Sequence, residues 1–441
     1  MKLGSIKLGS MLFLALCLSG AGFGQEPTAN STPSATHTLR CGALIQPAGG
    51  QVQRDVLITV AGGRIKEIRE QAGVVSTGDT IDLSDHTCLP GLIDAHTHVL
   101  LQGDITANDY DEQLLKQSVP YRTLLATRSV RRALEDGFTT IRDVETEGAG
   151  YADVDLKKAI AHGLIPGPRM QVATRALDVT GAYPLLGYAP DVPVPHGVQV
   201  VDGPDNARKA VREQISFGAD WIKVYSDRSY FLRPDGVLDD IPTFTLDELK
   251  AIVDEAHREG HKVASHAIGL NGVHNSIEAG VDSVEHGNYI SPADMKTMVQ
   301  KGIYYVPTLY VGEYVAQGRA EAGARVWVDM IKIHAETFRQ AVAAGVKIAF
   351  GTDVGGFDWG INQAVEFPVM VKYGMSPMQA IRAATSSAAD LLGMQNEIGS
   401  VTPGKYADIV AVKGDPLSDI SLLQKIDFVM KGGEIVKSPA R

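Results

Sequence analysis

Short hydrophobic runs recur along the middle of the chain, and most are separated by longer stretches in which hydrophobic residues recur at helical spacing. Regular alternation of short buried strands with amphipathic helices is typical of a parallel α/β fold. The pattern predicts strands at eight places: Leu92–His96, Thr139–Val144, Met170–Thr174, Trp221–Tyr225, Lys262–His266, Ser283–His286, Tyr304–Leu309 and Lys347–Thr352.

Glycine marks the end of most of the predicted helices, as expected where a left-handed residue caps a helix. Thr245-Leu246-Asp247-Glu248 has the spacing of a capping box and predicts the start of one of them. Eight strand–helix repeats over residues 91–395 fit a (β/α)8 barrel, although an open doubly wound sheet gives the same alternation. The predicted helices include Tyr121–Gly137, Asn206–Gly218, Leu246–Gly260, Val273–Gly280 and Met330–Gly345.

The two ends of the chain have a different sequence pattern from the middle. In them, hydrophobic and polar residues alternate, and glycine pairs interrupt the runs. Val56–Val60 and Arg64–Ile68 flank Gly62-Gly63 and predict a hairpin. Ala407–Val412 and Phe428–Val436 repeat this pattern near the C-terminus. We expect residues 39–90 and 396–441 to form one small β-sandwich built from both ends.

The first 24 residues have the features of a cleavable signal peptide. Lys2 and Lys7 precede the hydrophobic stretch Met11–Leu18, which is too short to span a bilayer, and Gly22 and Gly24 suit cleavage before Gln25. The alternative is an anchor that is retained. A signal peptide predicts a periplasmic or secreted protein with no membrane attachment after cleavage, and residues 25–38 are then a Ser/Thr/Pro-rich linker.

The charge balance argues against a nucleic-acid partner. Among 441 residues, 41 are Lys or Arg and 52 are Asp or Glu, so the formal net charge is −11. Loss of residues 1–24, which carry two lysines and no acidic residue, changes it to −13. Proteins that bind nucleic acid normally carry a basic excess. Cys41 and Cys88 remain in the mature chain, where they form either a disulfide or two buried thiols.

Polar residues with metal-ligand chemistry follow the predicted strands. His96 and His98 end the first strand and share one face of it, because alternate residues of a strand point the same way. In a barrel, residues at the carboxyl ends of all strands meet at one mouth. Imidazole and carboxylate groups suit zinc or a similar divalent metal. The predicted ligands are His96, His98, Lys223, His266, His286 and Asp353.

Lys223 is unusual in this set because an ammonium group repels a cation. It lies between Ile222 and Val224, and a lysine desolvated among hydrophobic residues has a lowered pKa and can act as a nucleophile. Reaction with carbon dioxide would give an anionic carbamate whose two oxygens can bridge two metals. The alternative for Lys223 alone is a buried lysine paired with a carboxylate.

The chain resembles the amidohydrolase superfamily through a series of motifs over nearly its whole mature length. Within the superfamily it is most similar to the branch that includes imidazolonepropionase, Xaa-Pro dipeptidases and ochratoxin-hydrolysing amidases. The resemblance implies a (β/α)8 barrel with two metals, in which His96, His98 and Asp353 hold the more buried one, His266 and His286 the more exposed one, and carboxylated Lys223 bridges them. The motifs are Pro90–His98, Ile222–Val224, Ser265–Ala267, Val284–Gly287, Gly351–Asp353, Ala384-Thr385 and Gly399–Asp408.

This ligand set predicts hydrolysis by a hydroxide shared between the metals, with Asp353 transferring the proton to the leaving group. Tyr225 shares a strand face with Lys223 and would donate to the oxyanion or to a substrate carboxylate, or else pack at the rim. Arg142, Arg228 and His196 are further candidate substrate contacts. Their alternatives are ordinary ion pairs, for example Arg142 with Asp143 or Glu145, and a surface histidine in the loop 176–203.

The expected function is metal-dependent hydrolysis of an amide bond in a small substrate that carries a carboxylate, such as a dipeptide or an N-acyl amino acid. Two zinc ions are the expected cofactors and a homo-oligomer the expected assembly. Hydrolysis of a cyclic amide or a lactone is the alternative. An inactive binding protein would be expected to lack ligands, whereas all six are present.

Overall fold

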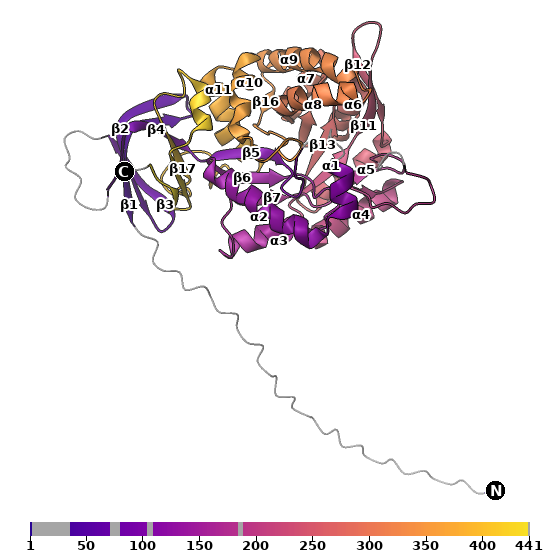
Figure 1. Cartoon of the computed structure of the whole chain (residues 1–441), viewed down its shortest axis with the longest axis horizontal. Coiled ribbons are helices and arrows are strands. Elements are labelled where there is room, and N and C mark those ends of the chain that lie inside the picture. The colour runs from indigo at the N-terminus through magenta and orange to yellow at the C-terminus, as the bar shows by residue number, and fades with distance from the viewer. Residues whose placement is uncertain (2–35, 71–79, 104–108, 184–187, 440–441) are drawn as a thin grey trace. The chain divides into compact units, whose positions relative to one another are not determined.

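The computed structural model describes residues 1, 36–70, 80–103, 109–183 and 188–439 (Figure 1). The predicted signal peptide, from residue 2 on, and most of the predicted linker lie outside this range. The last two linker residues, His37 and Thr38, are strand residues, so the β-rich N-terminal segment begins before residue 39. Within the described residues, no helix has the length and hydrophobicity that crossing a membrane requires.

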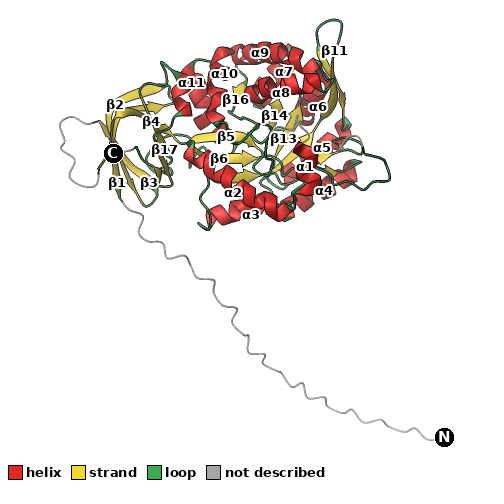
Figure 2. Ribbon diagram, viewed as in Figure 1, coloured by secondary structure: helices red, strands yellow, loops and turns green. Residues whose placement is uncertain are grey.

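Each of the eight predicted strand segments contains a strand. Figure 2 shows strands in yellow at the centre of this part of the chain and helices in red around them. The seventh strand ends at Val306, earlier than predicted, because Pro307 has no N–H to donate and Thr308 has a left-handed φ of 48°. These strands are β5 Leu92–Thr97, β6 Phe138–Asp143, β7 Arg169–Val172, β10 Trp221–Tyr225, β13 Lys262–Ala267, β14 Ser283–His286, β15 Tyr304–Val306 and β16 Lys347–Ile348.

The central strands form two sheets whose paired neighbours run parallel. One sheet has the order β16-β15-β14-β13-β10-β8-β9, with β8 Leu177–Asp178 and β9 Gln199–Val200 at its end, and the other is β5-β6-β7. The Asp220 N–H donates to Val172 beside β10, and the Asp353 N–H donates to His96 beyond β16. A parallel bridge also pairs Thr97 with Val354. Backbone hydrogen bonds therefore connect the two sheets at both sides.

Helices follow most of these strands, and their ends match the sequence signals. Thr245 and Glu248 form both hydrogen bonds of the predicted capping box, and Gly280 and Gly345 end their helices with φ values of 89° and 77°. The helices are α1 Asp109–Lys116, α2 Val119–Glu135, α3 Ala152–Ala161, α4 Pro204–Ser216, α5 Leu246–Arg258, α6 Leu270–Ala279, α7 Pro292–Lys301, α8 Leu309–Glu321, α9 Val326–Ala344, α10 Glu366–Lys372, α11 Pro377–Arg382 and α12 Ala388–Leu391. An antiparallel hairpin, β11 Asp227–Leu232 and β12 Leu238–Pro242, follows β10.

Strands from both ends of the chain share one seven-stranded sheet, as the alternating patterns suggested. The Ile65 N–H donates to Lys405 and the Ala407 N–H donates to Gly63, so β3 also contacts the segment that leads into β17. One hydrophobic cluster lies inside this unit and includes Leu39, Val56 and Phe428. The sheet order is β19-β18-β17-β4-β1-β2-β3, with β1 His37–Gln46, β2 Gln51–Ala61, β3 Arg64–Glu70, β4 Thr80–Pro90, β17 Ile409–Lys413, β18 Phe428–Lys431 and β19 Glu434–Lys437.

The sequence left two possibilities for Cys41 and Cys88, a disulfide or two buried thiols, and the structure shows the disulfide. Cys41 on β1 and Cys88 on the neighbouring parallel strand β4 form a disulfide, with their Cα atoms 6.0 Å apart. Both side chains are fully buried in the cluster of the terminal sheet. Because β4 runs almost directly into β5, this disulfide anchors the strand that leads to His96 and His98.

Candidate metal centre and active site

The four predicted histidine ligands come together at the carboxyl ends of the central strands. The ring centroid of His96 lies 5.3 Å from that of His98 and 4.9 Å from that of His286. The ring centroids of His286 and His266 are 4.5 Å apart. His286 and Asp353 have left-handed φ values of 68° and 62°. Such conformations are uncommon for residues other than glycine and often occur at functional sites.

Asp353 completes the same cluster. One of its carboxylate oxygens, Oδ1, lies 3.1 Å from His98 Nε2 and 3.6 Å from His96 Nε2. Burial alone would raise the pKa of Asp353, but the hydrogen bond from His98 and the positive charges around it lower this pKa to about 2. The carboxylate therefore stays ionised and can serve as a metal ligand.

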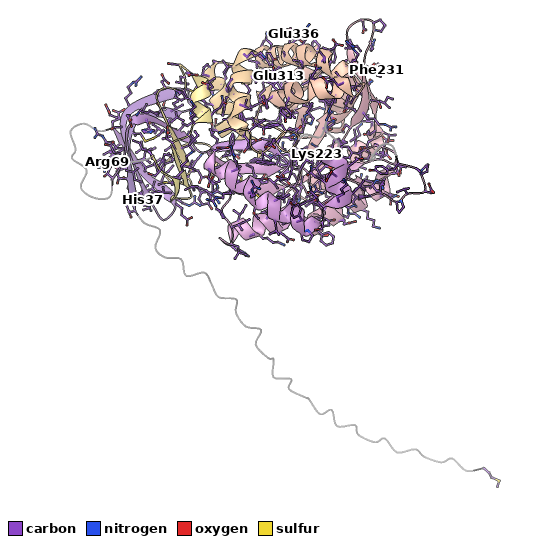
Figure 3. All side chains as sticks on the ribbon, viewed as in Figure 1. His37, Arg69, Lys223, Phe231, Glu313 and Glu336 are labelled. Carbon is purple, nitrogen blue, oxygen red and sulfur yellow. A yellow bond between two sulfur atoms is a disulfide. The ribbon has the colours of Figure 1, made fainter. Side chains whose placement is uncertain are left out.

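Lys223, labelled in Figure 3, is the middle residue of β10, is almost fully buried, and lines the same cavity as three of these histidines and Asp353. Burial lowers its pKa, against the opposing effect of the carboxylates of Glu285 and Glu145. A lowered pKa increases the fraction of neutral amine, which is the form that reacts with carbon dioxide. Lys223 is also close enough to the histidines and Asp353 to influence their pKa values, so the structure brings the six predicted ligands together.

Each of three histidines has one ring nitrogen bonded to a neighbouring side chain. His96 Nδ1 lies 2.7 Å from Glu285 Oε2, His286 Nδ1 lies 2.8 Å from Thr308 Oγ1, and His266 Nε2 lies 2.8 Å from the Tyr230 hydroxyl. Contacts of this kind fix the tautomer and orientation of metal-binding imidazoles. The remaining nitrogens, His96 Nε2, His286 Nε2 and His266 Nδ1, are the ones left to bind a metal.

The atoms of the cluster fit a divalent metal. His96 Nε2 is buried and has no hydrogen-bond partner among the described residues. A buried polar atom without a partner is costly unless something else satisfies it. Potential ligand atoms of His96, His286 and Asp353 lie within 4.8 Å of one another. Burial and the charge of Lys223 lower the pKa of His96 to about 4, so its imidazole is neutral, as metal binding requires.

Arg142 has a different position from the one expected, and this corrects its interpretation as a substrate contact. Its guanidinium is fully buried and donates to Glu285 Oε1 at 2.8 Å and to the Ala95 carbonyl at 2.5 Å. It also lies over the ring of Trp221, 4.4 Å from its centroid. Arg142 therefore lies in the protein interior. It donates to the carboxylate of Glu285, which is hydrogen-bonded to His96.

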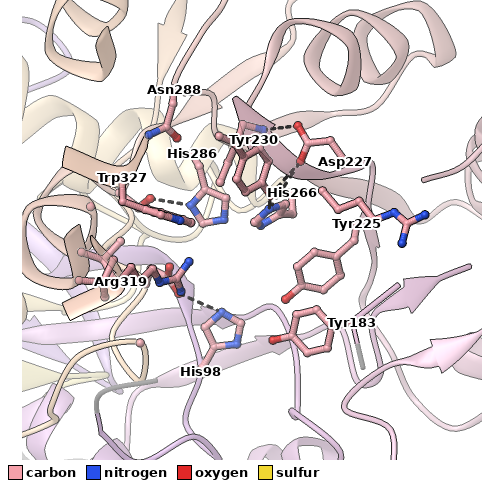
Figure 4. A pocket seen from close by; sticks show the side chains of 18 of the residues that line it. His98, Tyr183, Tyr225, Asp227, Tyr230, His266, His286, Asn288, Arg319 and Trp327 are labelled. Atoms are coloured by element: carbon pink, nitrogen blue, oxygen red, sulfur yellow. Dashed lines mark hydrogen bonds and ion pairs between the residues drawn. The ribbon is translucent and has the colours of Figure 1, made fainter. Parts of the chain in front are cut away.

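A cavity of about 440 Å³ opens onto the cluster (Figure 4). Arg228 and Tyr225 line it, whereas His196 is exposed and does not belong to the described lining. The Tyr225 hydroxyl donates to Glu145 Oε2 at 2.5 Å, and its ring packs 4.6 Å from that of His266. Tyr225 is thus both packed and hydrogen-bonded, and its hydroxyl faces a protein carboxylate.

Several residues of the site escaped the sequence analysis. Glu285 lies inside the motif Val284–Gly287. Tyr230 lies in β11, beyond the end of β10, so the alternation of side chains along β10 does not predict its direction. Glu145 and Glu147, just after β6, have the same one-residue spacing as His96 and His98 at the end of β5, and this spacing was a usable signal. Arg319 and Trp327 come from α8 and α9, far from any strand end, and carried none.

A parallel α/β core with histidine, carboxylate and lysine side chains at its strand ends defines a metal-binding hydrolase. The model of the amidohydrolase family matches residues 87–436, and the chain belongs to this family. Ochratoxinase from Aspergillus niger is 31% identical over 436 residues, which cover 93% of this chain and 88% of that protein. The protein is accordingly a hydrolase that acts on the carbon–nitrogen bond of an amide in a small substrate.

Solved structures agree with this assignment. A Xaa-Pro dipeptidase with methionine bound in its active site is 37% identical, with a TM-score of 0.82 over 91% of this chain and 99% of that chain. A prolidase complexed with N-methylphosphonate-L-proline is 28% identical, with a TM-score of 0.81 over 92% of this chain and the whole of that chain. The mixed α/β content and these neighbours identify the amidohydrolase fold.

Proposed function

We propose that the protein hydrolyses the peptide-like bond of a small substrate with a free carboxylate, such as a dipeptide or an N-acyl amino acid. The observation that carries this proposal is the presence of two arginines in the cavity next to the histidines. Arg228 and Arg319 both line it, and Arg319 lies over Trp327 with its guanidinium carbon 3.9 Å from the ring centroid. A guanidinium can bind a carboxylate through two parallel hydrogen bonds.

The proposed centre holds two zinc ions. His96, His98 and Asp353 would hold the more buried ion and His266 and His286 the more exposed one, and Lys223, if carboxylated, would supply a ligand to both. When bound, such ions polarise the carbonyl of the substrate and lower the pKa of water towards neutrality. The buried Nε2 of His96, which has no hydrogen-bond partner in the described part of the chain, and the lowered pKa of Lys223 support this arrangement.

Asp353 is the proposed proton carrier. Its carboxylate lies at the junction of His96 and His98 and also lines the cavity. It would accept the proton of the attacking water and return it to the leaving nitrogen, a transfer of the kind that contributes about 10²–10⁴-fold in rate. The ring of Tyr225 forms a wall beside His266, where it limits the volume open to the substrate.

The relatives support the choice of substrate class. Ochratoxinase, a Xaa-Pro dipeptidase with bound methionine and a prolidase with a proline phosphonate all resemble this chain over about nine-tenths of its length. Two of the three are named for substrates that contain proline. The cavity of about 440 Å³ is within the range of small-molecule sites.

A substrate panel tests the proposal. Purified, zinc-loaded protein is assayed with Xaa-Pro, Xaa-Arg and Xaa-Phe dipeptides, with N-acyl amino acids, and with a cyclic amide and a lactone. We expect hydrolysis of at least one carboxylate-bearing amide, with loss of activity when the carboxylate is converted to an amide. Turnover of the lactone or the cyclic amide alone would overturn the proposal in favour of the imidazolonepropionase-like alternative.

We infer that the bonds at both sides of the central sheets close one (β/α)8 barrel, and that the terminal sheet curls into a sandwich. We further propose a signal peptide cleaved before Gln25, a periplasmic or secreted location and a homo-oligomeric assembly. N-terminal sequencing of the exported protein tests the cleavage site and the location. Light scattering of the purified protein tests the homo-oligomeric assembly.

A further inference from the structure

Two neighbouring acidic residues lie beside the proposed metal centre but outside its ligand set. Glu145 and Glu147 follow β6, and both are almost completely buried. Acceptor atoms of these two residues and a ring nitrogen of His98 lie within 4.8 Å of one another. Glu147 also lines the cavity, so its carboxylate is buried in the protein and yet next to the space that a substrate would occupy.

Neutral hydroxyl groups surround this carboxylate pair. Tyr183 donates to Glu147 at 2.9 Å, Tyr110 donates to it at 3.0 Å, and Tyr225 donates to Glu145. Glu145 Oε1 is buried and has no hydrogen-bond partner among the described residues. This pair therefore has acceptor capacity left over at a buried position, where an unsatisfied polar atom is costly.

The nearby arginine does not use this capacity. The Arg122 guanidinium donates to the backbone carbonyls of Leu100, Thr146 and Glu147. It thereby holds Glu147 in a left-handed conformation with a φ of 49°. A strained conformation that the surroundings enforce is a sign of a preorganised site.

Glu147 and Arg319 lie on different sides of the cavity, while Arg228 donates to the Gly181 carbonyl. Figure 4 shows Tyr183 and Tyr225 on one side of the rings of His98 and His266, and Arg319 on the other. Glu147 belongs to the tyrosine side through its hydrogen bond from Tyr183. An extended substrate with a negative end and a positive end would match both sides, with its scissile carbonyl at the histidines between them.

We propose that Glu147, supported by Glu145, binds the free ammonium group of the substrate, so that this protein is specific for unblocked dipeptides over N-acyl amino acids. An ammonium group has three hydrogen-bond donors, which match the open acceptor positions of the pair. The inference rests on the proposed function and narrows it, because dipeptides and N-acyl amino acids differ at this end of the molecule.

The test compares Leu-Phe with 4-methylpentanoyl-phenylalanine, which has the same skeleton without the amino group. We expect the wild-type protein to prefer Leu-Phe by about 10² or more in kcat/KM, as sites built for a polar group discriminate against its absence. In Glu147→Gln this preference should fall about 10- to 100-fold, mainly through the KM of Leu-Phe, because one charged hydrogen-bonded contact is lost. The matched control Glu336→Gln, on the exposed surface of α9, should keep the wild-type preference.

Two further measurements separate the outcomes. Titration of the zinc-loaded protein with leucine and with 4-methylpentanoate compares binding without turnover, and Tyr183→Phe should weaken leucine binding if Glu147 variants fail to fold. Equal turnover of both substrates by the wild-type protein would overturn the inference but leave the amidase function standing. Turnover of neither these two compounds nor any other dipeptide or N-acyl amino acid of the substrate panel would remove the proposed function. Loss of a bound metal in Glu147→Gln would assign the pair to a cation and overturn the inference.

Discussion

His96 Nδ1 and Glu285 Oε2 lie 2.7 Å apart in the interior of the protein, and neither side chain is exposed to solvent. Glu285 is itself held by Arg142 and Ser283. A carboxylate in this position makes an imidazole a better ligand and leaves its other nitrogen available to a metal. The geometry of the proposed centre thus depends on a chain of contacts that extends from β6 through β14 to β5.

Replacing Glu285 with glutamine should weaken metal binding about 10- to 100-fold, the usual effect of losing such a partner. Competition with a chelator measures the affinity, and activity at saturating zinc shows how much catalysis returns. The matched substitution Glu336→Gln, on an exposed helix surface, should change neither. Unchanged zinc affinity in Glu285→Gln would show that Glu285 does not orient His96.

Lys223→Ala should abolish tight metal binding and activity, because the bridging carbamate cannot form. Short carboxylic acids should partially restore both, since a free carboxylate can take the place of the carbamate oxygens. The matched control is Lys209→Ala, on the exposed face of α4. Wild-type activity in Lys223→Ala would refute the bridging role.

The disulfide between Cys41 and Cys88 should stabilise the folded protein without contributing to catalysis. Closing a loop with a sequence separation of 47 residues is worth roughly 3–4 kcal/mol. Double substitution by alanine should lower the free energy of unfolding by about 2–4 kcal/mol. Denaturant titrations of the oxidised protein and the double variant measure the difference, and kcat/KM should remain within about twofold of wild type, since the pair lies in the terminal sheet.

Glu366 should make the protein less stable as the pH rises. Its carboxylate is fully buried and accepts the backbone N–H groups of Leu309 and Tyr310 at 2.8 Å, and burial outweighs these bonds and raises its pKa to about 8. A pKa that is higher in the folded state means that the folded protein binds the proton more tightly. Stability is therefore lost between the ordinary pKa of glutamate and pH 8, at most about 1.4 kcal/mol for each pH unit of the shift.

Glu366→Gln removes this titration. Compared with the wild-type protein, the variant should gain stability as the pH rises from about 5 to about 9. Its amide can accept only through one oxygen, so we expect it to be slightly less stable than wild type at the acidic end. Melting temperatures of both proteins across this range measure the effect. Parallel pH profiles would show that Glu366 is ionised in the folded protein throughout.

Much of the central fold followed from local pattern. Hydrophobic runs and helix-ending glycines predicted the eight strands, and the capping box at Thr245 needed only four residues of sequence. The candidate ligand set could be proposed because most of its members, such as His96 and His286, stand near the ends of predicted strands, and parallel strands place these ends together. Such signals are local, and one sequence is enough to display them.

The contacts that support the ligands could not be obtained in this way. Glu285 meets His96 across 189 positions of the chain, and Tyr225 meets Glu145 across 80. Arg142 was misinterpreted because a basic residue near a strand end has the same appearance whether it faces the cavity or the interior. Side-chain direction and distant partners are properties of the folded arrangement, and strand alternation alone did not reveal them.

The pairing of β4 with β17 has a consequence for how the protein is made. Cys88 and Ala411 are direct neighbours in this antiparallel pair, although more than 300 residues separate them in the chain. Contacts between such distant segments form late, because the intervening chain must be ordered first. The terminal sheet therefore cannot be completed until translation has passed β17, long after β1 to β4 have been made.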